Sequence, residues 1–153
     1  MHRLSRYTLF LLALLLSACQ APVKEEDSFN VPFSIIAQGD QSQLPLAKEL
    51  VIRDNTEWQY LWLAHTGDPG KVPPPIDFRT EMVMAFFLGQ RPAGGYAIQV
   101  QKIRVIDNHL LVELTVKHPD PRAHTTMALT QTHTIIKLPS YTLPVKFLYR
   151  QIQ

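Results

Sequence analysis

The histidines are the residues with which this chain could do chemistry, and they number six. His65, His109, His118, His124 and His133 lie beyond the apolar N-terminal segment. Imidazole can act as a general base, as the activator of a nucleophile or as a zinc ligand. None of these histidines lies in an HExxH motif, and the chain has no GxSxG elbow that would present a serine nucleophile. The sequence therefore predicts a protein that is not an enzyme and has no catalytic residue.

His118, His124 and His133 leave one alternative open. They would converge on a zinc ion if the proline-rich loop after His118 folded back on the threonine-rich segment that contains His133. No recognisable ligand spacing accompanies them, so we favour histidines in loops and on the surface of a sheet. We accordingly expect no metal and no cofactor.

Residues 89–96, with the sequence GQRPAGGY, hold three of the six glycines of the chain. Pro92 suits a turn position with φ near −65°, and Gly94 and Gly95 can both take positive φ. A turn requires neither the arginine nor the tyrosine, and both residue types are enriched at binding hot spots. A phosphate-binding loop is a weak alternative, because no GxGxxG spacing exists and no helix follows. The hypothesis is a protein contact made by Arg91, Pro92, Gly94, Gly95 and Tyr96.

The N-terminus has the features of a bacterial secretory signal in residues 1–18. Arg3 and Arg6 precede an apolar run of ten residues, which is shorter than the roughly 20 that a spanning helix needs. Residues 16–19, with the sequence LSAC, resemble a lipobox; the alternative is a soluble secreted protein with an incidental cysteine. The resemblance implies that Cys19 begins the mature chain and carries a diacylglyceryl group and an amide-linked acyl chain such as palmitate, which together anchor it stably. Gln20, in place of aspartate, favours the periplasmic face of the outer membrane.

Composition limits the partners further. Cys19 is the only cysteine, which excludes disulfides and thiolate metal sites from the folded domain. The chain has 15 basic and 13 acidic residues, and loss of Arg3 and Arg6 with the signal leaves the two counts equal. No basic run remains to match a phosphate backbone, so we expect no nucleic-acid partner. Residues 19–31 should form a polar tether, and residues 32–153 a single domain.

The elements of that domain follow from residue periodicity. Trp58, Leu61, Trp62 and His65 stand at i, i+3, i+4 and i+7, which predicts one amphipathic helix, with Asp54 as its N-cap and Gly67 at its end. Residues 33–37, 50–53 and 82–88 are strand-like, and the last of these should be buried on both faces and end at Gly89. A hairpin should follow, with a β-bulge near residues 101–102, a turn at residues 107–108, and then two more strands. The predicted class is α+β and β-rich, with six or seven mostly antiparallel strands in a sandwich-like arrangement.

Three segments, MVMAFFLGQRPAGGYAIQVQKI, VELTVKHPDPRAHTTMALTQTHTIIKLP and LPVKF, resemble the C-terminal domain of the protease complex subunit PrcB family over residues 78–147. The turn G-x-R-P-T-G-G-Y is the most specific part. Ala93 replaces the usual threonine, and residues 131–133 replace a stretch that often carries proline between aromatics. The resemblance implies a non-catalytic lipoprotein that associates with a protease or another envelope partner. A second possibility, by analogy of loop and fold class alone, is a small β-rich protease inhibitor of the chagasin type.

Overall fold

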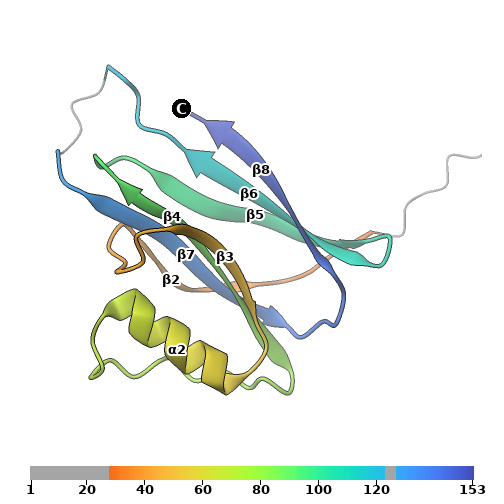
Figure 1. Cartoon of the computed structure of the whole chain (residues 1–153). Helices are drawn as coiled ribbons and strands as arrows, with labels where there is room; N and C mark the ends of the chain where they lie inside the picture. Colours follow the sequence, from red (N-terminus) through yellow and green to blue (C-terminus); the bar gives the residue numbers. More distant parts are fainter. Residues whose placement is uncertain (1–27, 123–126) are drawn as a thin grey trace, which may run out of the picture.

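The computed structural model describes residues 28–122 and 127–153. Their eight strands form two four-stranded sheets, and a helix packs outside one of them (Figure 1). Sheet A has the order β1 (Phe29–Asn30), β5 (Ala97–Ile106), β6 (His109–Lys117), β8 (Val145–Ile152). Sheet B has the order β2 (Ser34–Gly39), β7 (Thr130–Pro139), β4 (Glu81–Arg91), β3 (Ala47–Ile52). All pairs are antiparallel except β6 with β8. The α+β sandwich is therefore confirmed, with eight strands.

Strand β4 lies at the centre of the molecule and is buried on both faces, as its unbroken apolar sequence predicts. Alternate side chains point to opposite faces of a strand, so β4 contributes to two cores. The core between the two sheets contains Met82, Met84, Phe86 and Leu88. The core between sheet B and the helix contains Val83, Ala85 and Phe87.

Helix α2 (Asn55–Thr66) covers the outer face of sheet B (Figure 1). The carboxylate of Asp54 accepts from the backbone N–H of Glu57 at 2.9 Å, and Gly67 ends the helix with φ 66°. Trp58 is 1 % exposed, and its indole N–H donates to the carbonyl of Pro74 at 2.9 Å. The predicted helix, both of its ends and its packing on a sheet are confirmed.

The hairpin of β5 and β6 is also confirmed. Asp107 and Asn108 both have positive φ, the conformation that a two-residue hairpin turn needs. A register shift between Val100 and Lys102 is the predicted bulge.

Two predicted boundaries were wrong. Strand β4 continues past Gly89 to Arg91, because a bulge opposite β7 absorbs the glycine without ending the pairing. The fold also begins before residue 32, because β1 pairs with β5 and Val31 is 3 % exposed, with its N–H donating to the carbonyl of Ile103. The predicted signal peptide, Cys19 and most of the tether lie outside the described residues. Within the described residues, no helix has the length and hydropathy needed to span a membrane.

Candidate functional site

The residues singled out in the glycine-rich segment lie at one end of the sandwich. Arg91 is the last residue of β4, and its guanidinium carbon lies 5.6 Å from the centre of the Tyr96 ring. The Tyr96 ring meets the His118 ring edge-on, with centroids 5.6 Å apart. His118 Nε2 in turn lies 2.6 Å from Gln151 Oε1. The structure thus brings Arg91 and Tyr96 together and adds two polar groups, from the end of β6 and from β8.

The glycines of this segment do not all behave as the sequence suggests. Positive φ occurs at Gly89 (71°) and Gly95 (89°) but not at Gly94. The prediction of a left-handed pair at Gly94 and Gly95 was therefore half wrong. Gly94 is buried, whereas Pro92 and Gly95 are exposed at the surface.

Three threonines of β7 hold the segment in place. The hydroxyl of Thr130 donates to the carbonyl of Ala93 at 2.8 Å, and that of Thr134 to the carbonyl of Ile98 at 2.5 Å. Between them, Thr132 donates to the carbonyl of Tyr96 at 3.5 Å. Sequence reasoning treated these threonines only as strand formers. Their alternate spacing was the available signal, because it places all three hydroxyls on one face of β7.

A groove of about 260 Å³ opens between β3 and β8 at this end of the molecule. We name it the Arg91 groove. Its floor contains Leu88, Ile98 and Val116. Its polar lining comprises Lys48, Glu49, Arg91, His118, Tyr149 and Gln151. A second hollow of about 440 Å³ adjoins it, since both share His118 and Gln151.

Arg91 is the unusual group of the groove. Its Nε is buried and has no hydrogen-bond partner. Among the described residues its guanidinium takes part in no ion pair, although Glu49 lines the same groove. Glu49 instead accepts a hydrogen bond from the hydroxyl of Tyr149. Burial, together with this contact, raises the pKa of Tyr149 above its ordinary value, so the phenol stays a hydrogen-bond donor.

The histidines of the domain do not gather. His133 lies beneath α2 with its ring centroid 4.3 Å from that of His65, and it is 5 % exposed. The expectation that it lies on the surface was wrong, because it fills the aromatic core against Phe87. His118 packs on the other side of sheet B, so these two histidines cannot share one zinc ion; His124 lies outside the described residues. In the part of the chain that the structure describes, no three candidate ligand side chains form a metal site.

A serine lies beside the buried histidine pair. Ser42 Oγ is 3.0 Å from His65 Nδ1, which is the contact of a nucleophile with its base. Ser42 is 0 % exposed, however, and so cannot meet a substrate in this conformation. Burial, together with the smaller effects of His133 and Lys71 nearby, lowers the pKa of His65 to about 4. The cluster is therefore a neutral part of the core.

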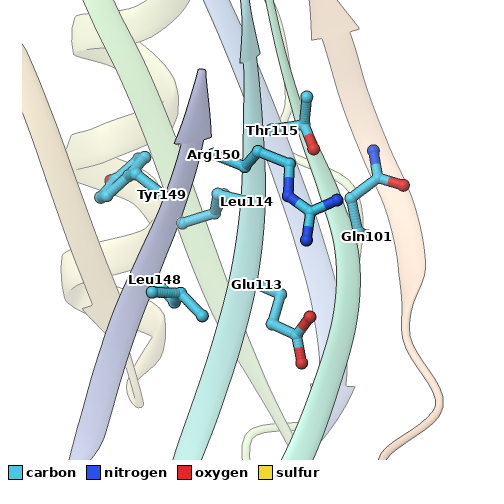
Figure 2. A pocket seen from close by; sticks show the side chains of 7 residues that line it. All are labelled: Gln101, Glu113, Leu114, Thr115, Leu148, Tyr149 and Arg150. Carbon is cyan, nitrogen blue, oxygen red and sulfur yellow. The ribbon is translucent and has the colours of Figure 1, made fainter. Parts of the chain in front are cut away.

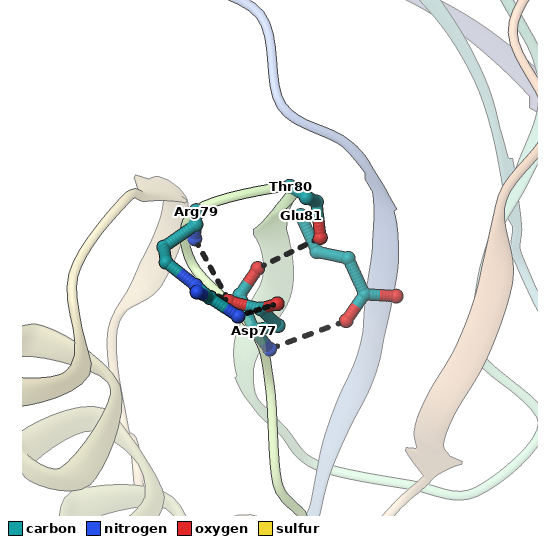
Figure 3. A network of polar contacts seen from close by, with 4 residues as sticks. All are labelled: Asp77, Arg79, Thr80 and Glu81. Carbon is teal, nitrogen blue, oxygen red and sulfur yellow. Dashed lines mark hydrogen bonds and ion pairs between the residues drawn. The ribbon is translucent and has the colours of Figure 1, made fainter.

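Two other polar regions have structural explanations. Before β4, the carboxylate of Asp77 accepts from Arg79, and its backbone N–H donates to Glu81 (Figure 3). Glu81 also pairs with Lys137 at 2.7 Å, and these partners lower the pKa of both carboxyl groups. The two acids hold the turn into β4 together and are not poised to exchange protons.

A hollow of about 370 Å³ lies on the outer face of sheet A. Figure 2 shows Gln101, Glu113, Thr115 and Arg150 projecting around it from β5, β6 and β8. Glu113 is occupied by an ion pair with Arg104 at 2.6 Å. Among the described residues, a buried side-chain polar atom without a partner lies in the lining of the Arg91 groove and none lies in the lining of this hollow.

The described residues thus define an α+β sandwich with an arginine-lined groove at one end. Residues 82–139 match the family model described as PrcB C-terminal. The matched segment, less than half of the chain, runs from β4 to the end of β7 and includes the loop with Arg91 and Tyr96. The resemblance to this family is therefore confirmed over that segment. Neither the curated proteins nor the solved structures include a match.

Proposed function

We propose that this chain is a non-catalytic accessory protein of the bacterial envelope, anchored by lipid at Cys19 and contacting a protease or another envelope complex. The match of residues 82–139 to the PrcB C-terminal model supports a protein partner of this kind. The contact surface is the end of the sandwich that carries Arg91, Pro92, Gly94, Gly95 and Tyr96.

The observation that carries this proposal is the state of Arg91. A buried guanidinium N–H normally has a partner, because leaving it unsatisfied costs about 1–3 kcal/mol. Arg91 Nε has none, and the same side chain lies over Tyr96 at the rim of a groove. An arginine and a tyrosine that contact each other at the rim of a groove form the kind of cluster that anchors a protein interface.

Replacing Arg91 by alanine should weaken partner capture and leave stability nearly unchanged. The side chain makes no ion pair within the described residues, so folding loses only its contact with Tyr96, about 0.5–1 kcal/mol. An interface anchor contributes about 2 kcal/mol or more, so capture from detergent-solubilised envelopes should fall at least about tenfold. Tyr96→Phe should act in the same direction.

Arg150→Ala is the matched control, since it removes an arginine of β8 that lies around the hollow on the outer face of sheet A. It should leave capture intact. Melting and capture are measured on the same preparations. A fall in the melting temperature that accounts for the whole loss of capture would make Arg91 and Tyr96 parts of the fold and remove the proposed contact. Inhibition of a co-purifying protease by the intact protein would instead favour the inhibitor alternative.

Replacing Cys19 by serine should release the protein from membranes. The apolar run of residues 7–16 is too short to span a bilayer, so the lipid would carry the attachment. Cell fractionation and carbonate extraction of the wild-type and Cys19→Ser proteins test this directly. If the processed Cys19→Ser protein remains with the membranes after carbonate extraction, the lipid anchor is refuted.

A further inference from the structure

We propose that the Arg91 groove holds an extended acidic segment of the protein partner, with an aspartate or glutamate carboxylate of that segment bound by the Arg91 guanidinium. This inference rests on the proposed function and adds to it the chemistry of the bound group. It follows from an unsatisfied donor, from the charges around that donor and from the strands that border the groove.

The unsatisfied donor selects an anion of a particular shape. A guanidinium presents planar, fork-like donors that match the two oxygens of a carboxylate, and such paired bonds are among the strongest in proteins. Arg91 carries these donors: its Nε is buried without a partner, while the side chain as a whole is partly exposed in the groove, so a carboxylate can reach the guanidinium from outside. The ring of Tyr96 holds the guanidinium in place, which reduces the entropy lost when a ligand binds.

The charges around the groove favour a negative ligand. Lys48 and Arg91 are its two lysine and arginine residues, and Glu49 is its single carboxylate in the described part of the chain. Glu49 forms no ion pair with Arg91 and is held by Tyr149. The protein therefore does not neutralise Arg91 with its own acid, and a carboxylate from outside would meet an uncompensated cation.

The strands around the groove favour a peptide over a free anion. Strand β3 is an edge of sheet B and β8 is an edge of sheet A. Alternate backbone groups of an edge strand have no partner in the sheet and can pair with an extended chain. The floor of Leu88, Ile98 and Val116 is apolar. It can pack against the side chains that flank the acid in a peptide, whereas a free phosphate has no apolar group to place there.

The test uses the Nε–H resonance of Arg91 in the full chain, purified in detergent. The probe is the peptide Ala-Glu-Ala with acetylated and amidated ends, and Ala-Gln-Ala with the same ends is its matched control. The glutamate peptide should shift the resonance saturably and bind at least about tenfold more tightly than the glutamine peptide. Arg91→Lys has no such resonance, so its binding of the two peptides is compared with that of the wild type by titration calorimetry; it should lose most of the preference, because lysine keeps the charge but not the fork. Arg150→Ala should keep it.

Equal shifts with both peptides, or none with either, would overturn the proposal. A shift caused by inorganic phosphate and not by the glutamate peptide would also overturn it. Failure here is distinguishable from failure of the proposed function. If capture from envelopes requires Arg91 but the glutamate peptide does not shift the resonance, Arg91 contacts the partner, and the proposal that it binds a carboxylate is wrong. If the peptide binds but capture is independent of Arg91, the groove binds carboxylates and the proposed partner contact through Arg91 is wrong.

Discussion

Replacing Gly89 by alanine should lower the free energy of unfolding by about 3 kcal/mol, which corresponds to a fall of roughly 10 °C in melting temperature for a chain of this size. Gly89 has φ 71°, a conformation that penalises a β-carbon. A β-carbon there would lie 2.6 Å from the backbone nitrogen of Ala47 and 2.9 Å from the carbonyl oxygen of Pro45. Both are backbone atoms, so no rotamer change relieves the clash.

The clash would fall where β4 contacts the start of β3 and the residues just before it. The N–H of Gln90 donates to the carbonyl of Pro45 at 2.9 Å, and the bulge at Gly89 is what directs it there. Gly70→Ala is the control, because Gly70 is exposed, has no positive φ and would place its β-carbon nearest a flexible carboxylate of Asp68. Urea unfolding measures both variants. Equal stability of the two would show that the backbone near Gly89 shifts freely.

The sequence predicts the fold well where burial alone decides the structure. The apolar run of β4 and the helical spacing of Trp58, Leu61 and His65 each have one arrangement that removes them from water. It predicts less where backbone geometry decides. Three glycines cluster in residues 89–96, and positive φ falls on Gly89 and Gly95 but not on Gly94; at Gly89 it accompanies the pairing of β4 with both β3 and β7.

The candidate site could also be predicted only in part from the sequence. Arg91 and Tyr96 could be identified as candidate contact residues because a turn does not require them. Glu49, Tyr149 and Gln151 could not, because they come from strands far away in sequence that meet Arg91 only through the stacking of two sheets. From the sequence, His133 is expected in a loop or on the surface of a sheet because no recognisable ligand spacing accompanies it. The helix α2, which packs over that face, buries it.

Acid should destabilise the protein through the buried side chain of His65. His65 has a pKa of about 4 in the fold against 6.5 for the free side chain, chiefly because of burial. Between these two values the unfolded chain binds a proton that the folded chain does not, so stability falls as the pH falls. The free energy of unfolding should be highest above pH 6.5 and should fall by about 2–3 kcal/mol as the pH approaches 4. Burial also lowers the pKa of His133, which adds to the effect.

The pH dependence of unfolding by urea separates His65 from other titrating groups. Asp77 and Glu81 have lowered pKa values in the fold, so they add to the loss of stability in the same direction, but only near the acid end of this range, where the unfolded carboxyl groups, with ordinary pKa values of 3.8 and 4.5, begin to take up protons. His65→Gln keeps a polar group beside Ser42 and removes the titration; its stability should vary much less between pH 6.5 and pH 4 than that of the wild type. His109→Gln, a change at the hairpin turn, should keep the wild-type slope. A slope unchanged in His65→Gln would mean that the aromatic core beneath α2 admits water, and that His65 is protonated there without loss of the fold.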